Sequence, residues 1–304
     1  METLSRLPVD NVVFPKLGID LTINSEAISI FGFSVKWYGV MIALGMLLAM
    51  MYCFRRTKEY GIDGDRLIDA VIAGVIGAVV GARLYYVVLH SASYHSIKDI
   101  LSIRDGGLAI YGGIIGGLLF GCIMAKIRKL KIMPTLDIAA MGLFIGQCLG
   151  RWGNFFNREA FGAYTDSVFA MAIPLEYYEN HGTLTSLQYS GIITDEMMQH
   201  TVNGCIWVQP TFLYEGMWNL ALFIFLLIWR KRKRFQGELL AIYVAGYGLG
   251  RFWIEALRTD PLMIGNTGLR VSQVLALCLV IGAIVFYVVR LRMSKRTVAE
   301  SGKE

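Results

Sequence analysis

Residues 271–290 read VSQVLALCLVIGAIVFYVVR, and only the last of these residues carries a charge. A helix of roughly 20 residues is long enough to cross a bilayer core about 30 Å thick. The segment 135–150 is shorter and 238–257 carries charge, but both have the same apolar character. The sequence predicts an all-α integral membrane protein, a bundle of seven spans near 35–54, 67–89, 108–125, 135–150, 207–229, 238–257 and 271–290.

The composition also indicates a membrane protein. Of the 304 residues, 55% are hydrophobic and only 17% are charged, which is too little charge to cover a soluble globule of this size. The same numbers exclude intrinsic disorder, which needs low hydrophobicity and high net charge. Membrane topology accounts for the net charge of +6, so we expect no nucleic-acid partner.

The basic residues predict the orientation of the chain. Eighteen of the 29 Lys and Arg residues lie in 55–66, 126–131, 230–234 and the tail from Arg290, which are alternate connections. The positive-inside rule puts these connections in the cytoplasm and the N-terminus outside. We therefore expect one polytopic membrane domain over 1–304, with a small extracytoplasmic head at 151–206 and a cytoplasmic tail at 291–304.

Neither the cysteines nor the N-terminus adds a further feature. The sequence has no CxxC pair and no His/Cys ligand spacing, so we expect no metal site and no disulfide framework. The first 25 residues lack a basic-then-apolar pattern, and we expect no cleavable signal peptide. The five cysteines are expected to be apolar packing residues: Cys53, Cys122, Cys148, Cys205 and Cys278.

Two glycine-rich stretches are expected to pack helices. They are GVIGAVVGARLYY (74–86) and YGGIIGGLLFG (111–121), in which small residues recur every three or four positions. Such spacing lets helix backbones approach closely in a membrane. Ionisable residues in spans are more informative, because a charge near mid-bilayer costs about 2.5–3.5 kcal/mol on insertion scales and normally faces a polar interior.

One polar cluster, GRWGNFFNREAFG (150–162), lies at the outer end of the fourth span. If its backbone is helical, Arg151 and Asn154 share a face at i, i+3, and Asn154 and Arg158 share one at i, i+4. Donors gathered at head-group level suit an anion. The alternative is an interfacial anchor with arginine side chains that reach toward the head groups.

A second cluster, GRFWIEALRTDP (250–261), places Arg251, Glu255 and Arg258 at i, i+4 and i+7. A helical face that carries these charges does not suit acyl chains. An Arg–Glu pair that only fixes helix packing is the alternative. Because two arginines outnumber one carboxylate, we expect one of them to be available for a ligand phosphate, which arginine binds in a planar, bidentate manner.

Three smaller blocks place polar groups at the outer ends of other spans. Each one alone is more typical of structure than of function, but with Arg83 they put polar residues in the outer halves of six spans. A pore or proton relay needs polar residues at successive depths, whereas a lipid head-group site needs them at one depth. The blocks are KWYG (36–39), RDGGLAIYGG (104–113) and QPTFLYE (209–215), which contain Trp37, Tyr38, Tyr111, Gln209, Tyr214 and Glu215.

These blocks resemble one known family, the bacterial prolipoprotein diacylglyceryl transferases. GRWGNFFNREAFG matches every fixed position of the family signature G-R-x-G-N-F-x-N-x-E-x-x-G. The other blocks follow in the family's order, so the resemblance covers the chain from about residue 30 to 290. It implies a seven-span enzyme of the bacterial inner or plasma membrane. Such an enzyme moves the diacylglyceryl group of phosphatidylglycerol onto the lipobox cysteine thiol of a prolipoprotein and releases glycerol phosphate.

The resemblance also implies residue roles. Arg151 is carried over as a phosphatidylglycerol-binding residue and Arg251 as a second arginine important for the reaction. The other matches are Asn154, Glu159 and Gly162 in the signature, Glu255 and Arg258 on the charged face, and Tyr38 in KWYG.

The chain departs from the family in two blocks. Some members carry a histidine where this chain has Tyr111, and some have His-Pro where it has Gln209-Pro210. The histidine in the first of these blocks has been considered as the base for the thiol. None of the four histidines of this chain lies in a matching block, which puts a universal histidine base in doubt.

The chemistry predicts how the residues divide the work. Sulfur displaces a phosphate monoester from a glycerol carbon, so arginines that meet the growing phosphate charge address the main barrier. Arg151 and Arg251 are expected to share one phosphate ester, with Arg258 and Asn154 assisting. The proton of the thiol is expected to go to Tyr111 or Glu159. We place Arg251, Tyr111, Glu159 and Glu255 in the catalytic group, and Arg151, Asn154, Arg258, Tyr38 and Gly162 in the lipid-binding group.

The partners follow from this reaction: phosphatidylglycerol, a prolipoprotein lipobox peptide and membrane lipids, with no cofactor and no metal. The rival hypothesis is a membrane transporter or binder of an anionic lipid or solute that uses the same arginines. The absence of paired discontinuous helices and of internal repeats argues against it. A purely structural scaffold leaves the charges in the spans unexplained.

Overall fold

The computed structural model describes residues 7–30, 33–91, 94, 96–102, 106–265 and 267–301. The chain falls into two compact units, one made of 1–50 and 140–304 and the other of 51–139. Each unit is described by itself below. The prediction that 1–304 forms a single membrane domain stays a prediction.

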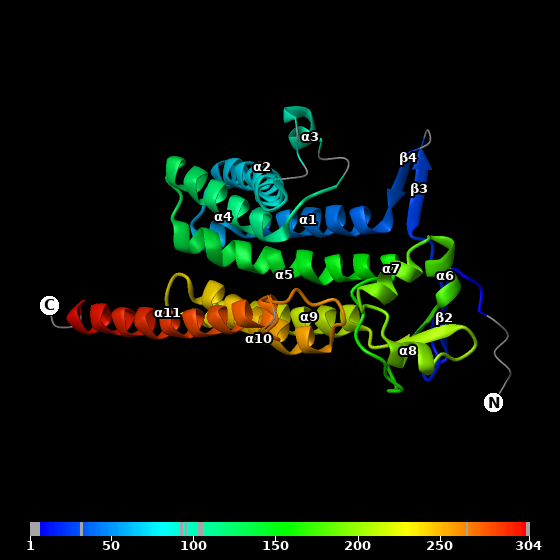
Figure 1. Cartoon of the computed structure of the whole chain (residues 1–304). Coiled ribbons are helices and arrows are strands. Elements are labelled where there is room, and N and C mark those ends of the chain that lie inside the picture. Colours follow the sequence, from blue (N-terminus) through cyan, green and yellow to red (C-terminus); the bar gives the residue numbers. More distant parts are fainter. Residues whose placement is uncertain are drawn as a thin grey trace. The chain divides into compact units, whose positions relative to one another are not determined.

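Each of the seven predicted spans corresponds to a helix (Figure 1). Six of these helices are long and apolar enough to cross a membrane, and the predicted class, a mostly helical membrane protein, is confirmed. The exception is α10, which carries Glu238, Arg251 and Glu255 within its 20 residues. The helices are α1 (Trp37–Arg56), α2 (Gly64–Leu89), α4 (Ile110–Ile127), α5 (Ile132–Asn157), α9 (Thr211–Trp229), α10 (Glu238–Leu257) and α11 (Val271–Ser301).

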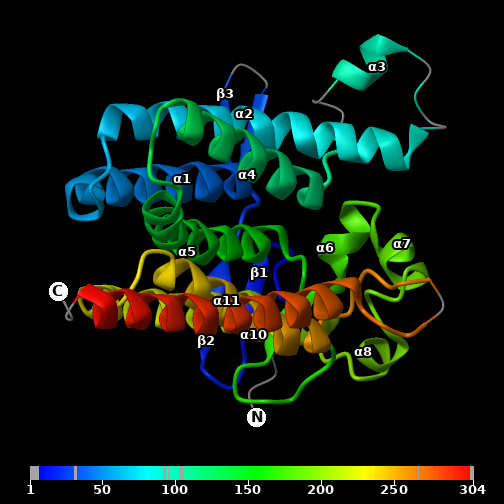
Figure 2. The same ribbon diagram turned by 90° about the vertical axis from the view of Figure 1, so that its left-hand side faces the viewer.

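In the unit 51–139, α2 and α4 pack closely against each other through their glycines. The two helices cross in Figure 2. A Cβ added at Gly77 would lie 2.6 Å from the carbonyl oxygen of Gly116, so only glycine permits this approach. The predicted packing role of the two glycine-rich stretches is confirmed here. A short helix, α3 (Ile97–Leu101), precedes α4, and a 3₁₀ turn, η1 (Thr57–Tyr60), precedes α2.

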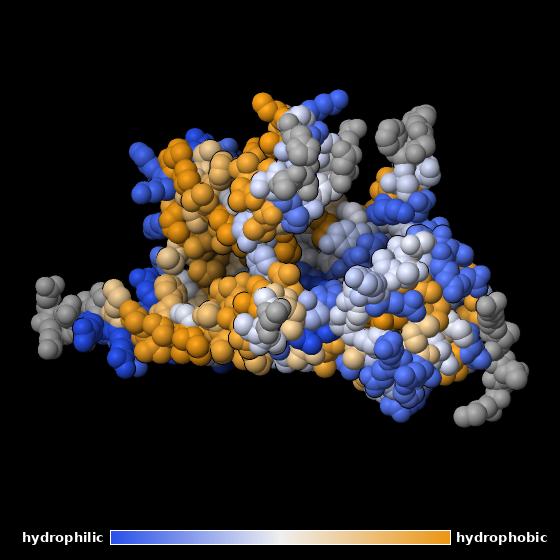
Figure 3. Space-filling model, viewed as in Figure 1, coloured by the Kyte–Doolittle hydropathy of each residue, from blue (hydrophilic) through white to orange (hydrophobic). Residues whose placement is uncertain are grey.

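In the other unit, α10 packs against both α9 and α11, and α10 and α11 run side by side in Figures 1 and 2. Hydrophobic side chains cover the outer surface of α11 in Figure 3, and hydrophilic ones gather near its end. The first half of α1 lies close to α5, where a Cβ on Gly45 would be 3.2 Å from the Cα of Gly146. A 3₁₀ turn, η3 (Arg230–Arg232), ends α9.

This unit also contains β-strands, which the all-α prediction lacked. Four antiparallel strands form a sheet in the order β2-β1-β5-β6, and a separate hairpin joins β3 to β4. The strands were missed because β1 and β5 are buried at every position and only four residues long, so their sequences do not alternate. The bounds are β1 (Asn11–Phe14), β2 (Ile19–Thr22), β3 (Glu26–Ile30), β4 (Phe33–Lys36), β5 (Met171–Pro174) and β6 (Cys205–Val208).

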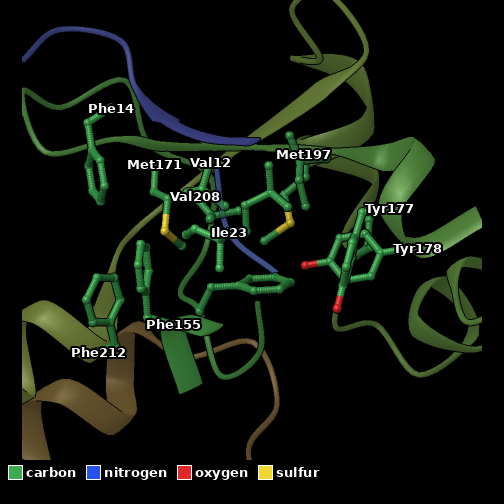
Figure 4. Close-up of a cluster of buried hydrophobic side chains, with 14 residues drawn as sticks. Val12, Phe14, Ile23, Phe155, Met171, Tyr177, Tyr178, Met197, Val208 and Phe212 are labelled. Carbon is green, nitrogen blue, oxygen red and sulfur yellow. The ribbon is translucent and has the colours of Figure 1, made fainter. Parts of the chain in front are cut away.

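A hydrophobic cluster fixes this sheet to the ends of α5 and α9. Figure 4 shows Phe155 of α5 and Phe212 of α9 beside Val12, Met171 and Val208 of the strands. The rings of Phe155 and Phe212 lie 4.6 Å apart between centroids. Three short helices lie between β5 and β6 along the chain: α6 (Leu175–Asn180), α7 (Leu184–Tyr189) and α8 (Asp195–Gln199).

The end of α5 differs from the prediction. The sequence predicted a span that ends at residue 150, but α5 continues for two more turns to Asn157. Packing of Phe155 into the cluster outweighs the weak helix propensity of the glycines and asparagines in this stretch. Arg151 and Asn154 therefore lie on a helix of the bundle.

Candidate active site

The site is built around one carboxylate that contacts two arginines. Nη2 of Arg151, on α5, lies 2.7 Å from Oε1 of Glu215 on α9. Nη1 of Arg251, on α10, lies 3.5 Å from Oε2 of the same carboxylate. The Glu215 side chain is only 3% exposed, whereas those of Arg151 and Arg251 are 22% and 19% exposed. The two arginines thus lie at one site, where α5 and α10 both meet Glu215 of α9.

Arg251 has a second carboxylate neighbour on its own helix. Its Nη2 lies 2.5 Å from Oε2 of Glu255, one turn further along α10. The Glu255 side chain is 2% exposed. The i, i+4 contact expected from the sequence is therefore present, and it holds the guanidinium between two buried carboxylates.

Arg258 is paired in a way that the sequence argument missed. Because α10 ends at Leu257, Arg258 caps this helix in an extended conformation and does not continue it. Its Nε and Nη2 donate to the two carboxylate oxygens of Asp260 at 2.8 and 2.6 Å. Burial alone would raise the pKa of Asp260, but these hydrogen bonds and the charge of Arg258 outweigh burial and hold that pKa below its usual value.

A chain of hydrogen bonds leads from Arg151 to Glu159. Nη1 of Arg151 donates to Oδ1 of Asn154 at 3.3 Å, and Nδ2 of Asn154 donates to Oε1 of Glu159 at 2.9 Å. Asn157 donates to the same oxygen at 3.3 Å. Glu159 itself is exposed. This arrangement connects the exposed carboxylate of Glu159 to the half-buried Arg151 through one amide.

Arg158 lies outside this site. Its backbone has a φ of 50° just after α5 ends, so the expected i, i+4 face with Asn154 does not form. The buried side chain donates to the carbonyl oxygens of Asp10 and Ile23, and it stacks 3.9 Å from the ring of Tyr177. Arg158 therefore connects the end of α5 to the N-terminal strands and to α6.

Gly162 brings the first cluster to two other blocks. Its N–H donates to the carbonyl oxygen of Gln209 at 2.9 Å, and the N–H of Ala163 donates to that of Leu257 at 3.0 Å. A Cβ at Gly162 would lie 2.8 Å from the Leu257 oxygen and 2.9 Å from the Cβ of Gln209. The signature, QPTFLYE and the end of α10 are thereby held together.

Tyr38 also contacts the C-terminal part of α5. A Cβ at Gly153 would lie 2.7 Å from the Tyr38 ring, and Trp37 stacks on Phe156 with centroids 5.2 Å apart. Four of the five sequence blocks therefore meet in this unit.

Tyr111 belongs to the other unit, as the second residue of α4. Ahead of it, Arg83 donates to five carbonyl oxygens between Asp99 and Gly107 and is 6% exposed, so its polar character has a local structural explanation. Arg104 and Asp105 of this block lie outside the described residues.

Three residues matter more than the sequence indicated. Glu215 was identified in its block but interpreted as structural, and Asp260 was given no role. Arg270, just before α11, donates to the backbone oxygens of Arg258 and Glu255 and so holds the end of α10 in place. An acid one turn inside an apolar span was the available signal for Glu215.

Comparison with known proteins supplies the family. A family model described as prolipoprotein diacylglyceryl transferase matches residues 25–289. The chain is 36% identical over 275 residues to the phosphatidylglycerol–prolipoprotein diacylglyceryl transferase of Clostridioides difficile. The aligned residues cover 90% of this chain and 98% of that protein. The enzymes of the same name from Clostridium novyi and Bacillus mycoides are 38% and 39% identical, over 87% and 92% of this chain and 95% and 96% of their own lengths.

Proposed function

Since the chain belongs to the prolipoprotein diacylglyceryl transferase family, we propose that Arg151 and Arg251 bind the phosphate of phosphatidylglycerol. The protein is a transferase that moves the diacylglyceryl group of this lipid onto the lipobox cysteine of prolipoproteins, the first step of lipoprotein maturation. A carbon–sulfur bond forms, the glycerol carbon–oxygen bond to phosphate breaks, and glycerol phosphate leaves.

One observation carries the site assignment: both arginines contact the Glu215 carboxylate, at 2.7 and 3.5 Å. Two guanidinium groups that converge on one carboxylate are spaced to converge on one phosphate, which presents oxygens in a similar geometry. They would meet the charge that grows on the leaving phosphate inside a site of low dielectric.

The remaining site residues have proposed supporting roles. Glu255 orients Arg251 through its 2.5 Å contact, and Asn154 orients Arg151. Arg258 assists binding at the rim. Gly162 and Tyr38 shape the lipid-binding site through the close contacts that they make.

A topology with seven spans is part of the proposal, and hydrogen-bond pairing supports it. Ala163 bonds to Leu257, so the chain must return to the same side of the membrane after α9, and α10 is the helix that can return it. Since α9 and α11 both pack on α10, its charges can face protein rather than lipid. With the positive-inside rule, this topology places the head outside and the C-terminus in the cytoplasm. The membrane is the inner or plasma membrane of a bacterium.

The proposed function is tested with purified protein, vesicles that contain phosphatidylglycerol and a lipobox peptide. We expect thioether-linked diacylglycerol on the peptide cysteine, detected by mass spectrometry, and no product from a cysteine-to-serine peptide. Anion transport without any modified peptide would support the rival transporter.

We propose that the reaction needs no cofactor and no metal, because the lipid carries the transferred group. The transfer rate is expected to stay unchanged after incubation with EDTA and dialysis. A loss of rate that added Mg²⁺ or Zn²⁺ restores would contradict this expectation.

The thiol proton is assigned by comparing two variants. We favour Glu159 over Tyr111, because Asn154 connects Glu159 to Arg151. Glu159→Gln is expected to lower kcat by about 100-fold. Glutamine keeps the oxygen that accepts from Asn154 and Asn157, so the loss would reflect the proton. Tyr111→Phe is expected to lower kcat less, and the reverse order would assign the proton to Tyr111.

A further inference from the structure

Among the described residues, Arg270 donates to backbone oxygens at the site, and the other three arginines each pair with a carboxylate. Arg151 and Arg251 face Glu215 and Glu255, and Arg258 is paired with Asp260. None of these three guanidinium groups is left without a carboxylate, in contrast to the surplus arginine expected from the sequence. A phosphate that binds here must therefore displace a carboxylate.

Glu215 is the carboxylate in the position that a bridging phosphate needs. It contacts both Arg151 and Arg251, whereas the Glu255 carboxylate forms an ion pair with Arg251 alone among the described residues and sits on the same helix. The 2.7 Å contact of Oε1 with Arg151 is an ion pair without hydrogen-bond alignment, and the contact with Arg251 is long at 3.5 Å. A phosphate with three or four oxygens can improve on both contacts.

A second observation indicates where the displaced carboxylate goes. Asn219 lies on α9 one turn after Glu215 and is fully buried. Neither its Oδ1 nor its Nδ2 has a hydrogen-bond partner among the described residues. Buried amides without partners are rare in proteins. Side chains at i and i+4 share a helix face, so Nδ2 of Asn219 is within reach of a rotated Glu215 side chain.

We propose that Glu215 is a placeholder for the phosphate, and that Asn219 receives its carboxylate when the phosphate binds. This inference rests on the phosphate site of the proposed function and adds a positioning residue to it. In the lipid-free protein, Glu215 keeps two like charges together. When a glycerol phosphate group arrives, it takes over both guanidinium groups, and Glu215 turns one helical step along α9 to the donor of Asn219.

The test is a double-mutant cycle on binding of glycerol phosphate to the full-length protein in detergent, measured by calorimetry. Glu215→Gln removes the competing charge and is expected to tighten binding about tenfold. Asn219→Leu removes the receiving donor and is expected to weaken binding about tenfold, because the displaced carboxylate has no partner. In the double variant, Asn219→Leu is expected to have no effect, since glutamine does not need to be displaced as a charge.

Several outcomes would overturn the placeholder. The first is that Asn219→Leu weakens glycerol phosphate binding equally in wild type and in the Glu215→Gln variant. The others are that Glu215→Gln binds glycerol phosphate more weakly than wild type, and that wild type does not bind it. Leu220→Ala, at an exposed position of the same helix, is the matched control and should leave affinity unchanged. Thermal unfolding checks each variant, and Asn219→Ala replaces Asn219→Leu in the cycle if leucine prevents folding.

Diacylglyceryl transfer by wild type is measured alongside the cycle, so that the two proposals can fail separately. If wild type transfers diacylglycerol but the effects of Glu215→Gln and Asn219→Leu on binding are additive, the placeholder role is rejected and the transferase function is kept. If the effects of the two substitutions on binding are coupled but wild type transfers no diacylglycerol, the anion site is kept and the assigned reaction is rejected.

Discussion

Arg151→Ala is expected to lower kcat/KM for diacylglyceryl transfer by about 1000-fold. The substitution removes one of the two positive groups that we propose meet the leaving phosphate. It also leaves the buried Glu215 with only the 3.5 Å contact to Arg251. The measurement is initial rate against phosphatidylglycerol concentration with a fixed lipobox peptide.

Arg151→Lys separates charge from geometry, since lysine keeps the charge but loses the planar pair of donors. We expect it to recover only part of the lost rate. Arg56→Ala is the control for loss of an arginine, because Arg56 is exposed and pairs with Glu59. A rate for Arg151→Ala within a few-fold of wild type would refute the phosphate assignment.

Gly162→Ala is expected to abolish most transfer activity through geometry alone. The added methyl would lie 2.8 Å from the Leu257 oxygen and 2.9 Å from Gln209, so the loop must move away from α10 and α9. Overpacking of this kind costs about 1–3 kcal/mol of stability. Because a shift of about 1 Å in a catalytic site can cost 100-fold in rate, we expect a loss of at least about 100-fold.

Gly282→Ala is the matched control, because nothing lies within 4 Å of a Cβ added at that position of α11. It is expected to keep the wild-type rate and unfolding temperature. Normal turnover by Gly162→Ala would show that the contact between the signature and the end of α10 is dispensable.

Hydrophobic length predicted the helices well, and helical spacing predicted contacts within one helix. The pair of Arg251 and Glu255 is an example, since one turn of α10 is enough to bring them together. The pairing of Arg151 with Glu215 could not be predicted in the same way. A helical pattern shows which residues share a face but not which helix that face will meet.

Local exceptions explain the other differences. The strands β1 and β5 pair across a long sequence separation and show no alternation that would predict them. Arg158 belongs to the same signature as Arg151, but the left-handed turn after Asn157 directs it to the carbonyl oxygens of Asp10 and Ile23. Residue type and motif alone did not distinguish Arg151, which pairs with Glu215, from Arg158, which bonds to backbone oxygens.

The pairing of β1 with β5 has a consequence for biosynthesis. Strand β1 leaves the ribosome before any of the spans, but Arg158, which bonds to Asp10, follows 148 positions later. The first strand must therefore stay available while four helices are inserted, with only β2 beside it. Nascent chains that end before β5 would expose an open strand edge, which favours aggregation.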